Sequence, residues 1–305
     1  MDRGIAVIGA ISSLGMCPYE DGEPRDVSRA PAVLRQRGLI ARIRAEDLGD
    51  VTPPAYTDYL PPPRRARNEQ QVVVYSRALA RRVEEATSSG RFALVLGGDC
   101  SIVLGCLLGL RPAPAEPIGL AYVDAHADFA TADESRSRSA SAMSLALASG
   151  RGASPLARLA GRTPLVDGRH VVLAGRRDMA EGPGGRAALT ATAILDVPDH
   201  QLQARGFGEL GALAARRLAA PDVHGFWIHL DADVLNPAIM FAVDSPRPGG
   251  PMPQELVEFL SPLVHHPRAR GLSISTYDPA FDPDRSCARQ LVGMFEMLFT
   301  RGANG

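Results

Sequence analysis

Residues 118–128 read IGLAYVDAHAD, and residues 226–233 read FWIHLDAD. Each stretch is a short, largely apolar run that is followed at once by acidic side chains. Runs of this kind, apolar throughout rather than alternating, are typical of parallel strands that are buried on both faces. Open α/β sheets bind their ligands along the carboxyl edge of such strands, so these acidic ends predict a ligand site.

The rest of the chain alternates between strand-like and helix-like patterns. Apolar runs predict strands at residues 5–9, 92–96, 118–124, 170–175, 192–195, 226–231 and 271–276. Helical periodicity predicts helices at residues 31–44, 68–87, 201–219, 253–264 and 286–300, the second capped by Asn68 or the residue before it. This alternation predicts a parallel α/β sheet, and we expect residues 1–305 to form a single domain.

Composition excludes several classes of function. The chain has 33 basic and 34 acidic residues, a net charge of -1, and no lysine. Schiff-base chemistry and a P-loop are therefore excluded, and no charge excess indicates nucleic acid or an anionic membrane. The four cysteines form no CxxC pair and no apolar stretch reaches 18 residues, so we expect a cytoplasmic protein with reduced thiols and no membrane span.

Two long polar or proline-rich stretches predict loops. Residues 52–67 hold five prolines, and residues 129–141 read FATADESRSRSAS directly after the acidic strand end. A loop of that length in a compact domain is more often functional than accidental.

A third strand end carries polar residues, in the run GGDCS at residues 97–101. In extended chain, residues two apart share a face, so Asp124, His126 and Asp128 should converge, as should Asp231 and Asp233. Four carboxylates facing one space repel each other unless cations lie among them, and oxygen-rich sites with a nitrogen suit Mn²⁺ or a similar ion. The alternative is that DAHAD is a solvated loop.

At these residues the sequence resembles the ureohydrolase family, which includes arginase, agmatinase and formimidoylglutamase. The family motifs GGDHS, DAHxD and SxDxDxxDP stand here as GGDCS, DAHAD and HLDADVLNP. The resemblance implies a three-layer, doubly wound sheet of about eight parallel strands, a dinuclear Mn²⁺ centre and a small-molecule substrate. It also implies a homo-oligomer, a trimer or hexamer.

Carried over by position, the resemblance implies six metal ligands. Asp124 and Asp231 match the bridging ligands, Asp128 matches a ligand of the first metal, and His126 and Asp233 match ligands of the second. Asp128 and Asp233 are also the predicted catalytic residues.

The sixth ligand position is a departure, because Cys100 stands where the family has a histidine. A thiolate suits Zn²⁺ or Fe²⁺ better than Mn²⁺. The alternative is a buried neutral thiol that leaves the first metal site weak or empty. A cysteine here is also seen in the branch of the family that hydrolyses N-hydroxyarginine.

Further departures concern the substrate. Ser141 replaces the proton-shuttle histidine, and Thr276 replaces the glutamate that grips the guanidinium, a role that Asp278 could take over if the strand end bends. The family motif GLRDVD reads GRRDMA here and keeps Asp178 but ends in Ala180, and an asparagine that meets the α-carboxylate is Ala130. We therefore predict Ser141, Asp178, Thr276 and Asp278 as substrate-binding residues and no partners for the amino-acid end of arginine.

His229 occupies the serine position of the third motif. Because it shares a strand face with Asp231, it could support the cluster from behind or supply the missing nitrogen, and the alternative is an ordinary core histidine.

These residues lead to one hypothesis and one alternative. The hypothesis is a metal-dependent hydrolase of a C–N bond in a guanidino, amidino or formimino compound. A metal-bridging hydroxide held by Asp124 and Asp231 would attack the carbon, and Asp233 or a water would pass the proton to the leaving amine. We do not expect L-arginine to be the substrate. The alternative is a catalytically degenerate protein of this fold that serves as a binding or regulatory subunit.

Overall fold

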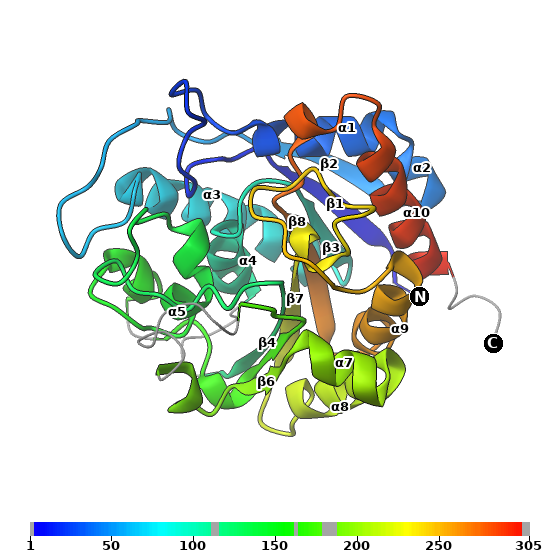
Figure 1. Cartoon of the computed structure of the whole chain (residues 1–305). Coiled ribbons are helices and arrows are strands. Elements are labelled where there is room, and N and C mark those ends of the chain that lie inside the picture. The colour runs from blue at the N-terminus through cyan, green and yellow to red at the C-terminus, as the bar shows by residue number, and fades with distance from the viewer. Residues whose placement is uncertain (1–2, 111–115, 162–163, 179–187, 301–305) are drawn as a thin grey trace.

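The computed structural model describes residues 3–110, 116–161, 164–178 and 188–300, and a sheet of parallel strands runs through its middle (Figure 1). In these residues the sheet has eight strands in the order β2-β1-β3-β8-β7-β4-β5-β6. The strands are β1 (Ile5–Ala10), β2 (Glu46–Val51), β3 (Phe92–Leu96), β4 (Ile118–Val123), β5 (Val171–Ala174), β6 (Leu195–Val197), β7 (Gly225–Asp231) and β8 (Ala269–Ser275).

Helices cover both faces of this sheet, which confirms the predicted three-layer, doubly wound architecture (Figure 1). One layer holds α3 (Glu69–Ser88), α4 (Ile102–Leu110) and α5 (Ser144–Ala148). The other holds α1 (Ala30–Gln36), α2 (Leu39–Arg42), α7 (Asp199–Arg205), α8 (Phe207–Leu218), α9 (Pro253–Val264) and α10 (Ser286–Thr300). Short 3-10 helices are η1 (Asp26–Arg29), η2 (Ser141–Met143), η3 (Pro155–Arg158), η4 (Gly168–His170), η5 (Ala232–Val234) and η6 (Pro279–Phe281).

The two apolar layers of the core come from alternate residues of the same strands. In β3, Phe92, Leu94 and Leu96 pack on the α9–α10 side, whereas Ala93 and Val95 pack on the α3–α4 side. This two-residue period explains why a continuously apolar run is required of a strand that has helices on both faces. Among the described residues, no helix is both long enough and apolar enough to cross a membrane.

Several predicted elements differ from the observed ones. The predicted helix at residues 31–44 is divided at Gly38, which has φ +82°, and the one at residues 201–219 is divided at Gly206, which has φ +96°. The strand expected at residues 192–195 begins only at Leu195. Strand β2 was not predicted because its sequence EDLGDV is polar at the sheet edge, and α4 was not predicted because IVLGCLLGL is apolar on all sides.

Asn68 stands at the N-cap position of α3, as predicted, but its side chain makes no capping hydrogen bond to the helix. It has φ +46°, and its side chain instead accepts a hydrogen bond from the Thr57 amide (2.9 Å) and donates one to the Leu14 carbonyl (3.1 Å). Asn68 therefore fastens the loop at residues 52–67 to the segment that follows β1. Both predicted loops, at residues 52–67 and 129–141, are free of helix and strand up to the start of η2.

The turn after β3 brings the first polar strand end to the carboxyl edge of the sheet. Gly97 and Gly98 have φ +82° and +81°, a backbone conformation that favours glycine. A β-carbon at Gly98 would lie 2.7 Å from the Ala10 carbonyl oxygen. The Gly98 carbonyl also accepts a hydrogen bond from the Thr276 amide (2.9 Å), so this turn ties the ends of β3 and β8 together.

We predict that Gly98→Ala lowers the free energy of unfolding by about 1–3 kcal/mol, because alanine would be strained in φ and would collide with backbone. The matched control is Gly293→Ala, since Gly293 lies within α10 and nothing is within 4 Å of its added β-carbon. The control should stabilise by about 0.4–1 kcal/mol. Denaturant unfolding measures both, and equal stabilities of the two variants would contradict the assignment of the turn.

Candidate metal centre

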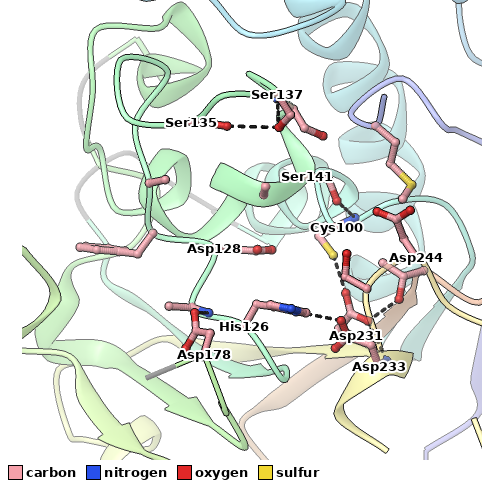
Figure 2. Close-up of a pocket in the computed structure, with 18 of the residues that line it drawn as sticks. Cys100, His126, Asp128, Ser135, Ser137, Ser141, Asp178, Asp231, Asp233 and Asp244 are labelled. Atoms are coloured by element: carbon pink, nitrogen blue, oxygen red, sulfur yellow. Dashed lines mark hydrogen bonds and ion pairs between the residues drawn. The ribbon is translucent and has the colours of Figure 1, made fainter. Parts of the chain in front are cut away.

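Four adjacent strands, β3, β8, β7 and β4, end beside one cavity of about 530 Å³. Figure 2 shows the side chains that converge there from these strand ends and from the loops that follow them. The predicted residues among its lining are Cys100, His126, Asp128, Ser141, Asp178, Asp231, Asp233 and Thr276. The cavity therefore brings together side chains that are far apart in the sequence.

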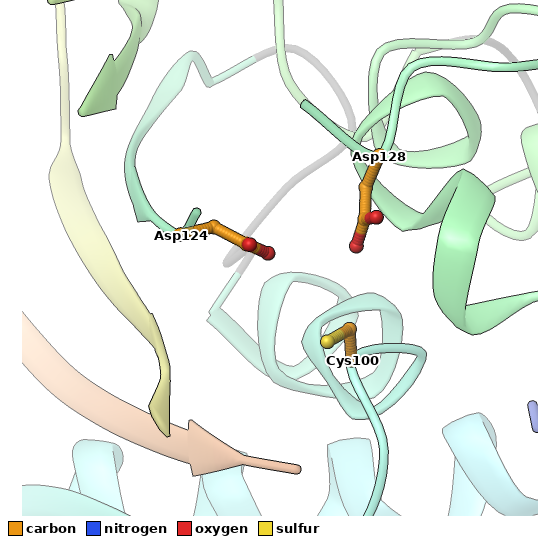
Figure 3. A group of neighbouring side chains, drawn as sticks. All are labelled: Cys100, Asp124 and Asp128. Atoms are coloured by element: carbon orange, nitrogen blue, oxygen red, sulfur yellow. The ribbon is translucent and has the colours of Figure 1, made fainter. Parts of the chain in front are cut away.

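Two groups of side chains are spaced to hold metal ions, and they share Asp124. One group is Cys100, Asp124 and Asp128, whose side chains point toward one another in Figure 3, and the other is Asp124, His126 and Asp233. Within each group the potential ligand atoms all lie within 4.8 Å of one another. A carboxylate common to two groups is in the position of a bridging ligand.

Asp124 provides the test of whether a cation fits. Its carboxylate is buried, Oδ1 accepts a hydrogen bond from the His126 amide (2.7 Å), and Oδ2 has no hydrogen-bond partner among the described residues. Burial and the charges of Asp233, Asp231 and Asp128 raise the pKa of Asp124 well above its ordinary value. A buried carboxylate oxygen without a donor is costly, and a metal ion would stabilise it. The residues present therefore fit a metal ion.

His126 faces the carboxylates with Nδ1, which lies 2.9 Å from Asp233 Oδ2 and 3.5 Å from Asp124 Oδ1. Burial lowers the pKa of His126, but the hydrogen bonds and charges of these two carboxylates outweigh it and raise the pKa to about 12. On the other side of the ring, Arg247 Nε lies 3.1 Å from Nε2. That contact is a hydrogen bond only while Nε2 carries no proton.

Asp128 is held by two hydroxyl groups that the sequence analysis did not single out. Its Oδ2 accepts hydrogen bonds from Tyr122 Oη (2.6 Å) and from Ser144 Oγ (3.3 Å). The backbone of Asp128 has φ +47°, which turns the chain after Ala127 and aims the carboxylate at the cluster. Burial raises the pKa of Asp128 to about 6 although the Tyr122 hydroxyl lowers it. Tyr122 lies two residues before Asp124 on β4, so strand alternation could have indicated it.

Cys100 is a thiol that donates a hydrogen bond to a carboxylate. Its Sγ lies 2.7 Å from Asp231 Oδ2, a contact that is marked by a dashed line in Figure 2. Burial and the charge of Asp231 raise the pKa of Cys100 well above its ordinary value. The other oxygen of Asp231 accepts hydrogen bonds from the Asp233 amide (2.8 Å) and from the Thr276 hydroxyl. Both carboxylate oxygens of Asp231 therefore accept hydrogen bonds.

His229 lies behind Cys100, in a buried chain of hydrogen bonds. Its Nε2 is 3.3 Å from Ser275 Oγ, which is 3.3 Å from Cys100 Sγ, and its Nδ1 is 2.9 Å from Ser273 Oγ. Burial lowers the pKa of His229 to about 3, so the ring is neutral. His229 therefore supports the cluster through Ser275 and does not take the place of the absent histidine.

Among the predicted substrate-binding residues, Ser141 and Asp178 line the cavity with their side chains engaged. Ser141 Oγ accepts a hydrogen bond from the Cys100 amide (3.3 Å). Asp178 accepts one from the Ala127 amide (2.8 Å) and pairs with Arg176 at 3.3 Å. Both residues therefore shape the wall of the site.

Asp278 lies elsewhere, which corrects the prediction that it could replace the family glutamate. Its carboxylate accepts hydrogen bonds from the Ala280 amide (3.0 Å) and the Tyr19 hydroxyl, at the start of η6, and it is not part of the cavity lining. The physical reason is Thr276, whose φ of +63° ends the strand period directly after β8. Alternation therefore cannot be extended from Thr276 to Asp278.

The loop between η5 and α9 contributes residues that sequence reasoning missed. Asp244, Ser245 and Arg247 line the cavity, and Asp244 pairs with Arg25 at 2.8 Å. These residues stand in the irregular stretch DSPRPGG, which follows no strand and carries no spacing that indicates a site. The serines of the loop at residues 129–141, namely Ser135, Ser137 and Ser139, line the same cavity.

The fold and this cluster together define an α/β protein with a candidate two-ion centre at its strand ends. Comparisons with known proteins agree. Residues 19–299 match the Arginase family. The arginase of Bacillus subtilis strain 168 is 30% identical over 82% of each chain. The solved arginase structure from Bacillus caldovelox has a TM-score of 0.86 at 28% identity and covers 98% of both chains.

The chain belongs to the arginase family and is a ureohydrolase-type hydrolase. The proclavaminate amidino hydrolase of Streptomyces clavuligerus, with a TM-score of 0.68 at 17% identity over 97% of this chain and 90% of its own, shares the fold. The family is one of dinuclear metal enzymes, and the two ligand groups around Asp124 agree with that property.

We predict that Asp124→Asn abolishes the stabilisation by a bound metal ion without lowering the stability of the metal-free protein. The amide removes one of the clustered negative charges, so the metal-free variant should melt at or above the temperature of the metal-free wild type. Mn²⁺ at 100 times its dissociation constant should stabilise the wild type by about 2.7 kcal/mol and the variant hardly at all. Differential scanning calorimetry with and without the ion measures both effects.

The matched control for this experiment is Asp278→Asn, which also removes one acidic charge but outside the cavity. It should keep the full response to the ion. A wild type that gains no stability from Mn²⁺, Zn²⁺ or Fe²⁺ would contradict the metal centre.

Proposed function

We propose that this protein is a metal-dependent hydrolase that cleaves a C–N bond in a guanidino, amidino or formimino compound. The observation that carries the proposal is the pair of ligand groups that share the buried Asp124, whose Oδ2 has no hydrogen-bond partner among the described residues, beside a cavity of a size that suits a small molecule. Membership of the Arginase family supports the same reaction class.

Two sets of residues would hold the ions. Asp124, His126 and Asp233 offer two carboxylates and an imidazole, which suit Mn²⁺, whereas Cys100, Asp124 and Asp128 include a thiol, which favours Zn²⁺ or Fe²⁺. Asp231 belongs to neither set, but its carboxylate lies next to the second one, where it contacts the Cys100 thiol. When bound, such ions polarise the substrate and make a water molecule more acidic.

The remaining chemistry belongs to side chains of this chain. Asp128 and Asp233 both line the cavity, so we propose that they hold and return the proton that the leaving nitrogen needs. The Tyr122 and Ser144 hydroxyls orient Asp128, and His126 orients Asp233. Ser141 lies where the family has a histidine, and its hydroxyl is engaged with the Cys100 backbone.

The substrate differs, in our proposal, from L-arginine. The names of the relatives favour a guanidino compound. However, the Thr276 hydroxyl is directed to Asp231 and adds no negative charge where the family glutamate grips the guanidinium. A charged group enclosed without its partner costs several kcal/mol, roughly hundreds- to thousands-fold in rate.

We predict that urea release from L-arginine is at least about 100-fold slower than hydrolysis of the best compound in a panel of guanidino, amidino and formimino compounds. The panel is assayed with Mn²⁺, Zn²⁺ and Fe²⁺ in turn, and ammonia or urea release is measured. The control is Asp124→Asn, which should be inactive toward every compound. Arginine turnover equal to that of the best panel compound would overturn this choice of substrate.

We predict that Cys100→His raises the affinity for Mn²⁺ and lowers the preference for Zn²⁺ or Fe²⁺, because an imidazole replaces a soft thiol beside Asp124 and Asp128. Metal content by mass spectrometry, together with melting temperature, measures the change. If Cys100 is only a packed thiol, the larger ring costs about 1–3 kcal/mol of stability and brings no metal. That second result would remove Cys100 from the ligands.

The regulatory alternative and the biological setting are tested by simpler measurements. Protein purified without chelator that holds no metal and hydrolyses nothing in the panel would favour a binding or regulatory subunit.

We also propose that the chain acts in the cytoplasm as a homo-oligomer, a trimer or hexamer, and its four free cysteines support a reducing compartment. Light scattering measures the oligomeric state.

A further inference from the structure

We infer that Arg177 is a positioning residue that holds one of the two ligand groups in shape for its ion. That group is Asp124, His126 and Asp233, and its members come from the segments that directly follow β4 and β7. The inference rests on the proposed metal-dependent function and deepens it. It draws on a ring of hydrogen bonds, on the close packing of backbone around the guanidinium, and on a contrast between the two groups.

Three adjacent strand ends are joined by hydrogen bonds that involve Arg177. These strands lie in the order β7-β4-β5, and Arg177 follows β5. Its amide donates to the carbonyl of Ala125 (2.7 Å), the residue between Asp124 and His126. The Ala125 amide in turn donates to Asp233 Oδ1 (3.2 Å). The Arg177 guanidinium closes the ring by donating to the Asp233 carbonyl (2.9 Å). Both parts of the ligand group are therefore fastened to the end of a third strand.

The guanidinium of Arg177 also fastens the chain that follows β7. It donates to the Val234 carbonyl (2.9 Å) and, at greater length, to the Arg247 carbonyl (3.4 Å). Backbone packs closely around it, because a β-carbon added at Gly250 would lie 2.7 Å from the Arg177 Nη1 atom and 2.5 Å from the Val234 carbonyl oxygen. Several backbone carbonyls thus share one side chain as their donor, and a smaller residue would release the backbone that carries Asp233.

The ligand group that contains Cys100 is held by other elements. Cys100 follows β3, and Asp128 accepts hydrogen bonds from the Tyr122 and Ser144 hydroxyls. Among the described residues, Arg177 donates no hydrogen bond to any of these four. Loss of the Arg177 side chain should therefore weaken one ion position and leave the other.

The charge of Arg177 and its hydrogen bonds act on a bound ion in opposite directions. The positive charge lies near enough to Asp199, Asp233 and Asp124 to interact with them, and a positive charge beside a cation site weakens binding. The hydrogen bonds hold ligands in place, which strengthens binding. The second effect is the larger, because the guanidinium donates to the backbone of Asp233 and leaves its carboxylate to the ion.

The experiment measures ion affinity in Arg177→Ala. Mn²⁺ is titrated by calorimetry to follow the group that contains His126, and Co²⁺ is titrated by its thiolate absorption band to follow the group that contains Cys100. We expect Mn²⁺ to bind about 10- to 100-fold more weakly than in the wild type, as for other residues that orient metal ligands, and the Co²⁺ titration to be unchanged. Guanidinium chloride below denaturing concentrations should restore the Mn²⁺ affinity of the variant and leave the wild type unaffected.

Arg268→Ala is the matched control. Arg268 likewise donates to three backbone carbonyls, those of Ala219, Ala220 and Val223 (3.1, 2.6 and 3.2 Å), but it precedes β8 at the opposite edge of the sheet. This variant should also melt at a lower temperature than the wild type, yet it should keep its Mn²⁺ affinity.

Arg177→Lys separates charge from hydrogen bonding, because lysine keeps the charge but not the planar fork of donors. It should bind Mn²⁺ more weakly than the wild type, and it tests the same point if Arg177→Ala does not fold. A role of the charge alone would instead make Arg177→Ala bind Mn²⁺ more tightly and leave Arg177→Lys like the wild type.

The outcomes separate this inference from the proposed function. Mn²⁺ affinity that is unchanged or higher in both Arg177 variants, a loss that Arg268→Ala shares, or an equal loss in the Mn²⁺ and Co²⁺ titrations would overturn the role of Arg177 and leave the metal centre in place. A wild type that binds neither ion would overturn the centre and this inference together. A loss that guanidinium restores, in a protein that hydrolyses no compound of the panel, supports the role of Arg177 and overturns the proposed reaction.

Discussion

Mutual repulsion among four clustered carboxylates governs the carboxyl edge of this sheet. The four belong to the ends of two adjacent strands, β4 and β7, where Asp124, Asp231 and Asp233 are buried and Asp128 is half-buried. Burial raises the pKa of Asp124 and of Asp231, and their charged neighbours raise it further. The fold tolerates such a cluster only where cations or donors are supplied to it, and a metal-dependent hydrolase uses the same arrangement to hold its ions.

The donors that serve this cluster come from every neighbouring element. His126 faces Asp233, Tyr122 and Ser144 hold Asp128, and Cys100 meets Asp231. The departures from the family pattern are therefore integrated into the site: Cys100 and Thr276 both direct a proton at Asp231, where the family has a histidine and a glutamate. The Thr276 replacement removes a negative charge from the substrate side of the site, which is consistent with a substrate other than arginine.

Several positions at which sequence reasoning failed have backbone outside the regular periods. Thr276 has positive φ, and the glycines that divide two predicted helices do as well. Alternation predicts the direction of a side chain only while the chain stays extended, so it indicated the cluster on β4 and β7 but misplaced Asp278. The strand β2 and the helix α4 were missed because burial there does not follow an amphipathic pattern: one is polar at an edge and the other is apolar all round.

The sequence by itself determined the class of fold, the edge of the sheet where the site lies and the chemical nature of its ligands. Apolar runs that end in GGDCS, DAHAD and DAD encode all three, because burial on two faces and polar strand ends are local properties of the chain. The tertiary structure alone decided that His229 reaches Cys100 through Ser275. It also decided that Arg247, from a loop 121 residues beyond His126, faces that imidazole. Contacts of this kind depend on how loops fold back over the sheet, and no period in the sequence records that.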